Sequence, residues 1–181
     1  MAVTEAVKRL HWGCGTVTPT GWINSDLWEH PGVDLCADIL DGLPLPDDSI
    51  DYAVSNHALQ ELDLYDEEVA LAELRRVLKP GGVLRLCLPD LDRAIAAYLD
   101  RDAEYFLVRE WETVAGNFIT QIRWHGYNKT LFTYEFAEEL ARKAGFARVE
   151  QAAYRETASA FPEITALDTR PDESFYLEAW K

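Results

Sequence analysis

The sequence has few basic residues, no long apolar run and little sulfur. Its 181 residues carry 17 Lys and Arg against 32 Asp and Glu, for a formal net charge of −15. A surface of that sign repels nucleic acids and anionic membranes, because affinity for them depends on basic residues that meet phosphates. No apolar run approaches the roughly 18 residues of a membrane-spanning helix, and residues 1–9 contain no apolar signal core. We therefore expect a cytoplasmic protein that binds neither nucleic acid nor a membrane.

Cysteine is also scarce, and the three cysteines form no motif. Cys14, Cys36 and Cys87 are odd in number and include no Cys-x-x-Cys pair. Each lies in an apolar, strand-like stretch, so we expect three buried free thiols in a reducing compartment and no metal site. Apolar residues make up 48% of the chain, which is enough for one globular domain over residues 1–181.

Apolar periodicity predicts strands that alternate with helices. The strands are expected over 8–12, 22–28, 33–38, 49–57, 83–89, 147–154 and 174–180, and the helices over 66–78, 90–99, 104–123 and 134–144. This order favours an α/β fold with a doubly wound, mostly parallel, Rossmann-like sheet. The last two strands follow one another directly, so the final strand is expected to be antiparallel.

The first two strands are joined by a loop, Thr16–Gly21, where such folds carry a helix. A missing helix leaves one side of the sheet uncovered, and we expect an apolar patch there. A second copy of the chain, in a homodimer, or the aromatic-rich segment 104–124 is expected to cover it. Within the domain, residues 100–130 are interpreted as a lid over a substrate or as an interface.

The expected strands end in residues suited to a nucleoside. In open sheets of this type a ligand lies beyond the carboxyl ends of the strands. Those ends carry Gly13–Gly15, Asp26, Asp38, Asn56–His57 and Pro89–Asp90. Glycines admit close backbone approach, and a carboxylate can accept hydrogen bonds from ribose hydroxyls or an exocyclic amine. Tight turns and surface aspartates explain each feature separately. No phosphate-binding Gly-x-x-x-x-Gly-Lys motif occurs, so an adenosine ligand without phosphates fits best.

Four stretches then carry a family resemblance. "LHWGCG", "ADILDGLPLPDDSIDYAVSNHAL", "ALAELRRVLKPGGVLRLCLPDLDR" and "LFTYEFAEELARKAGF" resemble a class I S-adenosylmethionine-dependent methyltransferase. The resemblance is to a small bacterial subgroup with a shortened connection between the first two strands. It implies S-adenosylmethionine as cofactor, and it implies cofactor-binding roles for eight residues: Gly13, Cys14, Gly15, Asp26, Leu27, Asp38, Ile39 and Asn56.

The sequence departs from the family pattern at His11, Val17 and Glu61, where an acidic residue, a glycine and a histidine are usual. The resemblance implies methyl transfer to a small-molecule acceptor. Two alternatives stay open. A non-catalytic cofactor-binding or scaffolding domain would fit the departures. Methylation of a basic protein or peptide would fit the acidic surface.

His57 and His125 are the candidate catalytic bases. His57 follows the fourth strand, and His125 stands between Trp124 and Tyr127. We expect both imidazoles to line one acceptor cavity beneath residues 104–127. A base of this type loses activity as the pH falls through the ordinary histidine pKa, near ~6.5. A structural role for each histidine, and a helix-capping role for Asp90, are the alternatives.

Overall fold

A computed structural model of the chain describes residues 6–181. Residues 1–5, part of the stretch in which no apolar signal core is expected, lie outside the described residues. Within the described part, seven strands form one sheet in the order β3-β2-β1-β4-β5-β7-β6. The strands are β1 (Arg9–Trp12), β2 (Ile23–Asp26), β3 (Leu35–Cys36), β4 (Ile50–Asn56), β5 (Leu78–Pro89), β6 (Arg148–Ala152) and β7 (Ser174–Trp180). Strands β1 to β5 are parallel, and β7 runs antiparallel to both β5 and β6. The predicted fold class is confirmed, including the antiparallel final strand.

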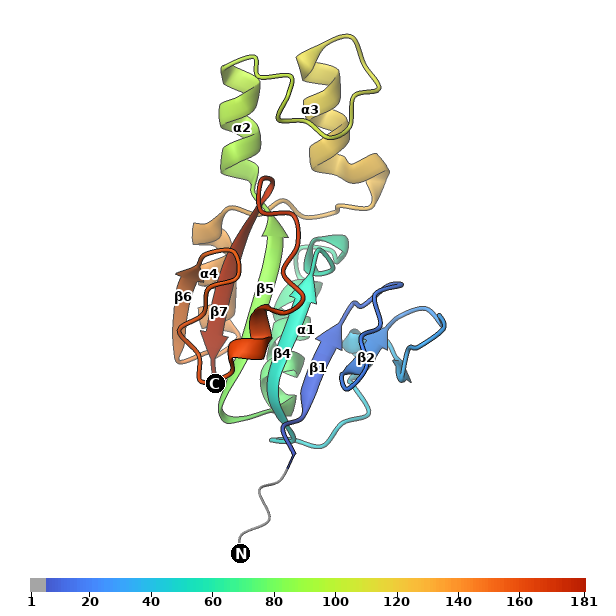
Figure 1. Cartoon of the computed structure of the whole chain (residues 1–181), viewed down its shortest axis with the longest axis vertical. Coiled ribbons are helices and arrows are strands. Elements are labelled where there is room, and N and C mark those ends of the chain that lie inside the picture. Colours follow the sequence, from blue (N-terminus) through green and yellow to red (C-terminus); the bar gives the residue numbers. More distant parts are fainter. Residues whose placement is uncertain (1–5) are drawn as a thin grey trace, which may run out of the picture.

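Two helices cover one face of this sheet (Figure 1). They are α1 (Asp66–Val77) and α4 (Tyr134–Lys143), which contact each other. Each presents an apolar stripe to the core, formed in α4 by Ala137, Leu140 and Ala141. Thr133 accepts a hydrogen bond from the backbone of Phe136 and fixes the start of α4, as predicted.

The opposite face is covered by irregular chain and not by segment 104–124. The connection between β6 and β7 carries the short 3-10 helix η4 (Pro162–Thr165) and crosses in front of β4 and β5 (Figure 1). Its Phe161, Ile164 and Leu167 pack with Trp22 and Tyr52 into a second apolar cluster. The loop between β1 and β2 contains no helix, as expected. The prediction that segment 104–124 covers this face is therefore wrong, and the homodimer stays a prediction.

Helices α2 (Leu91–Leu99) and α3 (Val114–Arg123) stand beyond the carboxyl ends of the strands (Figure 1). The predicted helix over 104–123 begins ten residues late, after the N-cap Thr113. Side chains satisfy the backbone of the preceding stretch: Gln121 accepts from Leu107 N, and Asn117 accepts from Trp111 N. Because these bonds replace helical ones, that stretch folds as a loop.

Two smaller findings concern surface and solvent. Cys14 and Cys87 are buried free thiols, but Cys36 is exposed, because β3 is a two-residue edge strand. The expectation of three buried thiols was wrong for Cys36. Across residues 6–181, no helix is long and apolar enough to cross a membrane.

Arg85, in the middle of β5, binds the connection between β6 and β7 to the sheet. Its side chain is fully buried, and it lies between the buried carboxylates of Asp168 and Glu178. It donates two bonds to Asp168, one to Glu178, and one each to the carbonyls of Glu156 and Ala153. These five bonds use all five N–H groups of a guanidinium.

Removing this cation should destabilise the fold strongly. We expect Arg85→Met to lower the free energy of unfolding by roughly 3–5 kcal/mol, because two carboxylates would stay buried without a counter-ion. Urea denaturation measures the change. The matched control is Lys143→Met, which breaks an exposed pair with Glu139 and should cost at most about 1 kcal/mol. A similar small cost for both variants would contradict the role assigned to Arg85.

Candidate active site

The glycine turn after β1 lies where the sequence placed it. Both glycines have positive φ, 66° at Gly13 and 51° at Gly15, which favours residues without a side chain. A Cβ at Gly13 would overlap the Cβ of Ala58, so the turn packs closely on the segment after β4. A Cβ at Gly15 would meet no atom within 4 Å. The turn is therefore tight on one side and open on the other.

Asp26 ends β2 and is tied directly to this turn. Its Oδ2 accepts from the backbone N–H of Gly15 at 2.7 Å, and its Oδ1 accepts from Trp28 N at 3.0 Å. The backbone of Cys14 bonds to Ser25 O, so the turn and the end of β2 form one unit. An ionised carboxylate has about four acceptor positions, and two of those of Asp26 are used.

Three other predicted cofactor residues, Leu27, Asp38 and Ile39, follow the carboxyl ends of β2 and β3. Asp38 follows β3, and its Oδ1 accepts from Leu40 N at the start of η1 (Ile39–Asp41). The Ile39 side chain is buried in the main core, whereas Leu27 is exposed beside Asp26. Parallel pairing of β1, β2 and β3 brings Gly13–Gly15, Asp26 and Asp38 to the same edge.

Asn56, the remaining predicted cofactor residue, is directed elsewhere. Its Nδ2 donates to Leu167 O at 2.7 Å, in the connection that covers the opposite face. Its Oδ1 is buried with no hydrogen-bond partner. The Asn56 side chain is thus held by the connection between β6 and β7, whereas the β1–β4 register keeps its backbone beside the glycine turn.

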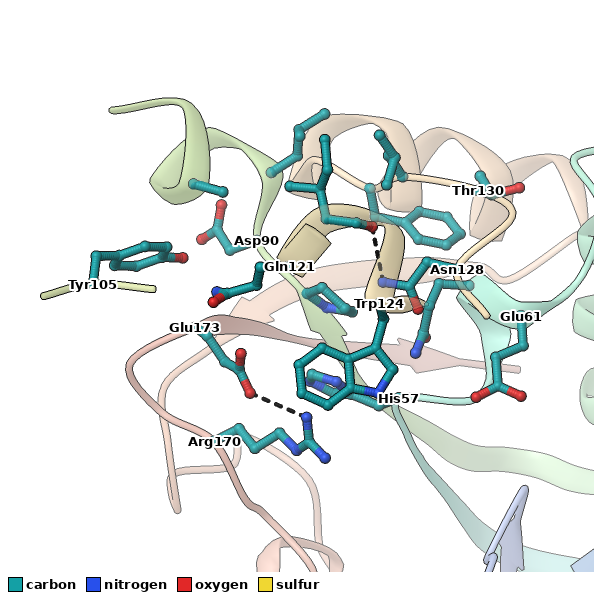
Figure 2. A pocket seen from close by; sticks show the side chains of 17 residues that line it. His57, Glu61, Asp90, Tyr105, Gln121, Trp124, Asn128, Thr130, Arg170 and Glu173 are labelled. Atoms are coloured by element: carbon teal, nitrogen blue, oxygen red, sulfur yellow. Dashed lines mark hydrogen bonds and ion pairs between the residues drawn. The ribbon is translucent and has the colours of Figure 1, made fainter. Parts of the chain in front are cut away.

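A cavity of about 120 Å³ opens beyond the ends of β4 and β5. Its walls come from His57, from η2 (Leu59–Glu61), from the start of α2, from the end of α3, and from residues 128–132 and 170–173. Tyr105, Gln121 and Trp124 bring the predicted lid segment to the cavity (Figure 2). None of the eight predicted cofactor residues lines it. The ligand edge is therefore divided into a glycine-turn part and a cavity part.

His57 lines the cavity but is not an ordinary base. Its Nε2 lies 2.7 Å from the hydroxyl oxygen of Ser174 on β7. Burial, reinforced by the charge of Arg170, lowers the pKa of His57 to about 3. The imidazole is therefore neutral at physiological pH. The expected loss of activity near pH 6.5 is wrong for this residue.

His125 does not line the cavity. It lies in η3 (Trp124–Gly126), where Trp124 and His125 both have positive φ. Its side chain is nearly half exposed, and its Nε2 is 3.8 Å from Glu110 Oε1. Trp124 lines the cavity, whereas His125 does not. The prediction that both histidines line one cavity is wrong for His125, although its ring centre lies 5.9 Å from that of Trp124, which does line it.

The sequence reasoning missed most of the polar cavity wall. Gln60, Glu61, Asp90, Arg170 and Glu173 all line it. Of these, the sequence singles out only Glu61, as a departure from the family pattern, and Asp90, as a helix-capping residue. Asp90 does cap α2 by accepting from Arg93 N. Arg170 and Glu173 follow an irregular connection, where no periodic pattern marks them.

The neutrality of His57 is directly testable. Its Cε1–H signal should keep its position between pH 7.5 and 5.5 in an NMR titration, because burial holds its pKa near 3. The variant His57→Gln identifies the signal by its loss. A midpoint for His57 between pH 6 and 7 would contradict the environment described here.

Comparison with known proteins agrees with this arrangement. Residues 27–86 match the family model described as "Methyltransferase domain". An uncharacterized 37.1 kDa protein in transposon TN4556 of Streptomyces fradiae is 43% identical over 70 residues. That match covers 39% of this chain and 20% of the relative, so the chain corresponds to a small part of the relative's length.

Two solved structures extend the likeness over the whole fold. A SAM-dependent methyltransferase of Thermotoga maritima has a TM-score of 0.61 at 21% identity, over 99% of this chain and 84% of that chain. An S-adenosylmethionine-dependent methyltransferase of Mesorhizobium loti has a TM-score of 0.56 at 20% identity, over 100% of this chain and 94% of that chain. The chain therefore has the fold of the class I S-adenosylmethionine-dependent methyltransferases and carries, over residues 27–86, a segment of the methyltransferase-domain family.

Proposed function

We propose that the chain transfers a methyl group from S-adenosylmethionine to a small molecule bound in the cavity beneath α2 and α3. The observation that carries the proposal is the division of the ligand edge. The glycine turn with Asp26 lies at the ends of β1 and β2, and a separate cavity lies at the ends of β4 and β5. A two-substrate transferase needs both places side by side.

The glycine-turn part fits the cofactor. Gly15 leaves open space beside the backbone, and the fixed carboxylate of Asp26 retains acceptor positions for the two ribose hydroxyls. Cys14 and Leu27 flank these groups, and Asp38 with the backbone of Ile39 would face the adenine. When bound, the cofactor supplies a methyl carbon that is already activated for displacement.

The chain's own residues then have the task of orientation and exclusion of water. Tyr105, Gln121 and Trp124 form the wall contributed by the lid segment. His57 is neutral and hydrogen-bonded to Ser174, so it orients and does not store a proton. Alignment of acceptor and methyl carbon accounts for a large part of such a reaction's acceleration.

The size of the cavity supports a small-molecule acceptor. A space of about 120 Å³ accommodates a small organic molecule, whereas a protein acceptor would place only one side chain in it. A cavity lined by several polar side chains beyond the strand ends is expected of an enzyme more than of a scaffolding domain. We retain methyl transfer to a small molecule as the function that these observations support best.

Cofactor binding tests the proposal. S-adenosylmethionine or its demethylated product, S-adenosylhomocysteine, should raise the melting temperature, because a ligand selective for the folded state stabilises it. Asp26→Asn should weaken binding by roughly 10- to 100-fold, as one charge-assisted bond is worth about 1.5–3 kcal/mol. Asn keeps an acceptor for Gly15 N, whereas Asp26→Ala would also loosen the turn.

The control is Glu29→Gln, which removes one exposed charge from the next turn and should leave affinity unchanged. Calorimetry gives both affinities. The proposal fails if millimolar S-adenosylhomocysteine produces neither heat nor a thermal shift. If Asp26→Asn binds as tightly as the parent chain, Asp26 serves the turn and not the ribose.

A further inference from the structure

The cavity wall is rich in carboxylates. Among the described residues that line it are Glu61, Asp90 and Glu173, with Arg170 as the guanidinium. Glu173 is only 8% exposed, and its Oε1 lies 3.2 Å from Arg170 Nη1 (Figure 2). Asp90 is paired from outside the cavity, with its Oδ2 3.1 Å from Arg93 Nε. These three carboxylates outnumber the two guanidinium groups, Arg170 and Arg93, that pair with them.

Glu61 is the third carboxylate of the cavity wall, and unlike Glu173 it is exposed to solvent. Burial, together with the negative charge of Asp26, raises the pKa of Glu61, and Lys129 lowers it only in part. Lys129 itself is paired with Asp63 at 3.1 Å. Because Asp26 contributes to the raised pKa of Glu61, the cavity wall and the glycine turn carry carboxylates that repel each other. A cation between them would relieve this repulsion.

Gln60 supplies an independent sign of a missing hydrogen-bond donor. Its side chain is 3% exposed, lines the cavity, and has a buried Oε1 without a hydrogen-bond partner. Its backbone carbonyl is fully used by Lys129 N and Thr130 N, so the side-chain amide is held in place. A buried acceptor without a donor costs free energy, and an N–H group of a ligand would remove that cost.

The aromatic wall is also suited to positive charge. The Arg170 guanidinium lies 5.4 Å from the ring centre of Trp124, which is cation–π distance. Burial, with the charges of Asp90 and Glu173, raises the pKa of Tyr105 to about 12. Its hydroxyl therefore stays neutral. An anionic ligand would find only Arg170, which is already engaged by Glu173.

We infer that the cavity binds a small organic amine as its ammonium form, with an apolar body against Trp124 and Tyr105. The inference rests on the proposed function, whose acceptor class it names. An ammonium has no free electron pair, so its nitrogen takes the methyl group only after its proton passes to a carboxylate of the cavity wall, and Glu61, whose pKa is raised, is the candidate proton acceptor. The carboxylates of Glu61, Asp90 and Glu173 neutralise the ammonium, and Gln60 Oε1 accepts one of its N–H groups. Neutral alcohols and carboxylates of the same shape bind more weakly, because they lack the charge or carry the wrong one.

Three molecules of one shape test the inference: phenethylamine, 2-phenylethanol and phenylacetate. Calorimetry at pH 7.5 should give an affinity for phenethylamine at least about 10-fold above that for 2-phenylethanol, the scale of one charge-assisted bond. Phenylacetate should give no heat. Titrations with and without S-adenosylhomocysteine separate this site from the cofactor site.

Variants identify the groups responsible. Glu173→Gln should lower the affinity for phenethylamine by roughly 10-fold. Because the change also releases Arg170, it should create measurable binding of phenylacetate. Asp90→Asn keeps a helix-capping side chain and should weaken phenethylamine alone. The matched control is Asp92→Asn, an equal change of charge on the exposed side of α2, which should leave all three affinities unchanged.

The outcomes distinguish the two proposals. The inference is overturned if 2-phenylethanol or phenylacetate binds as tightly as phenethylamine, if none of the three binds, or if Asp92→Asn matches Asp90→Asn. In each of these cases heat from S-adenosylhomocysteine would leave the proposed function standing. Phenethylamine selectivity without any S-adenosylhomocysteine binding would support the cation site and reject the methyl-transfer function.

Discussion

The fold depends on one buried cation, Arg85. All five of its N–H groups bind the β6–β7 connection or β7 itself, so a chain segment with almost no regular structure is fixed against the sheet. That segment fills the face from which the usual helix between β1 and β2 is missing. An irregular cover has few internal backbone bonds, and it needs such an external anchor to stay in register with the strands. The same anchor sets where residues 168–174 run, and these residues form one wall of the cavity.

The shortened connection between β1 and β2 changes the architecture without moving the ligand edge. Parallel pairing alone places the ends of β1, β2 and β4 together, so the glycine turn and Asp26 keep their places when a helix is lost. Helices α2 and α3 stand over the other half of the edge (Figure 1). The short helix η2, with Gln60 and Glu61, lies between the two halves. This explains why Glu61 is electrostatically coupled to Asp26 and also lines the cavity.

The sequence predicts the presence of the strands and the starts of α2 and α4 well, because these follow local rules. Asp90 and Thr133 cap the helices they precede, and the buried runs form the central strands. The apolar cover of Phe161, Ile164 and Leu167 has no period, so nothing local distinguishes it from an exposed loop. The direction of His125 depends on the positive φ of two successive residues, Trp124 and His125. Neither residue is a glycine, so the sequence gives no local sign of this conformation. The late start of α3 follows from side-chain bonds that only the folded chain brings together.

Burial of His57 has a consequence for the charge of the whole cavity. A histidine of ordinary pKa beside three carboxylates would gain a proton and cancel part of their charge. Here desolvation and Arg170 hold the pKa of His57 at about 3, so the imidazole adds no positive charge at physiological pH. The carboxylates of Glu61, Asp90 and Glu173 therefore meet no positive imidazole at that pH, although burial raises the pKa of Glu61 and of Glu173. The formal net charge of −15 on the chain acts in the same direction at longer distance, since a surface of one sign concentrates ligands of the opposite sign. Local and global electrostatics thus agree in selecting a cationic ligand, and the neutral histidine is what keeps them in agreement.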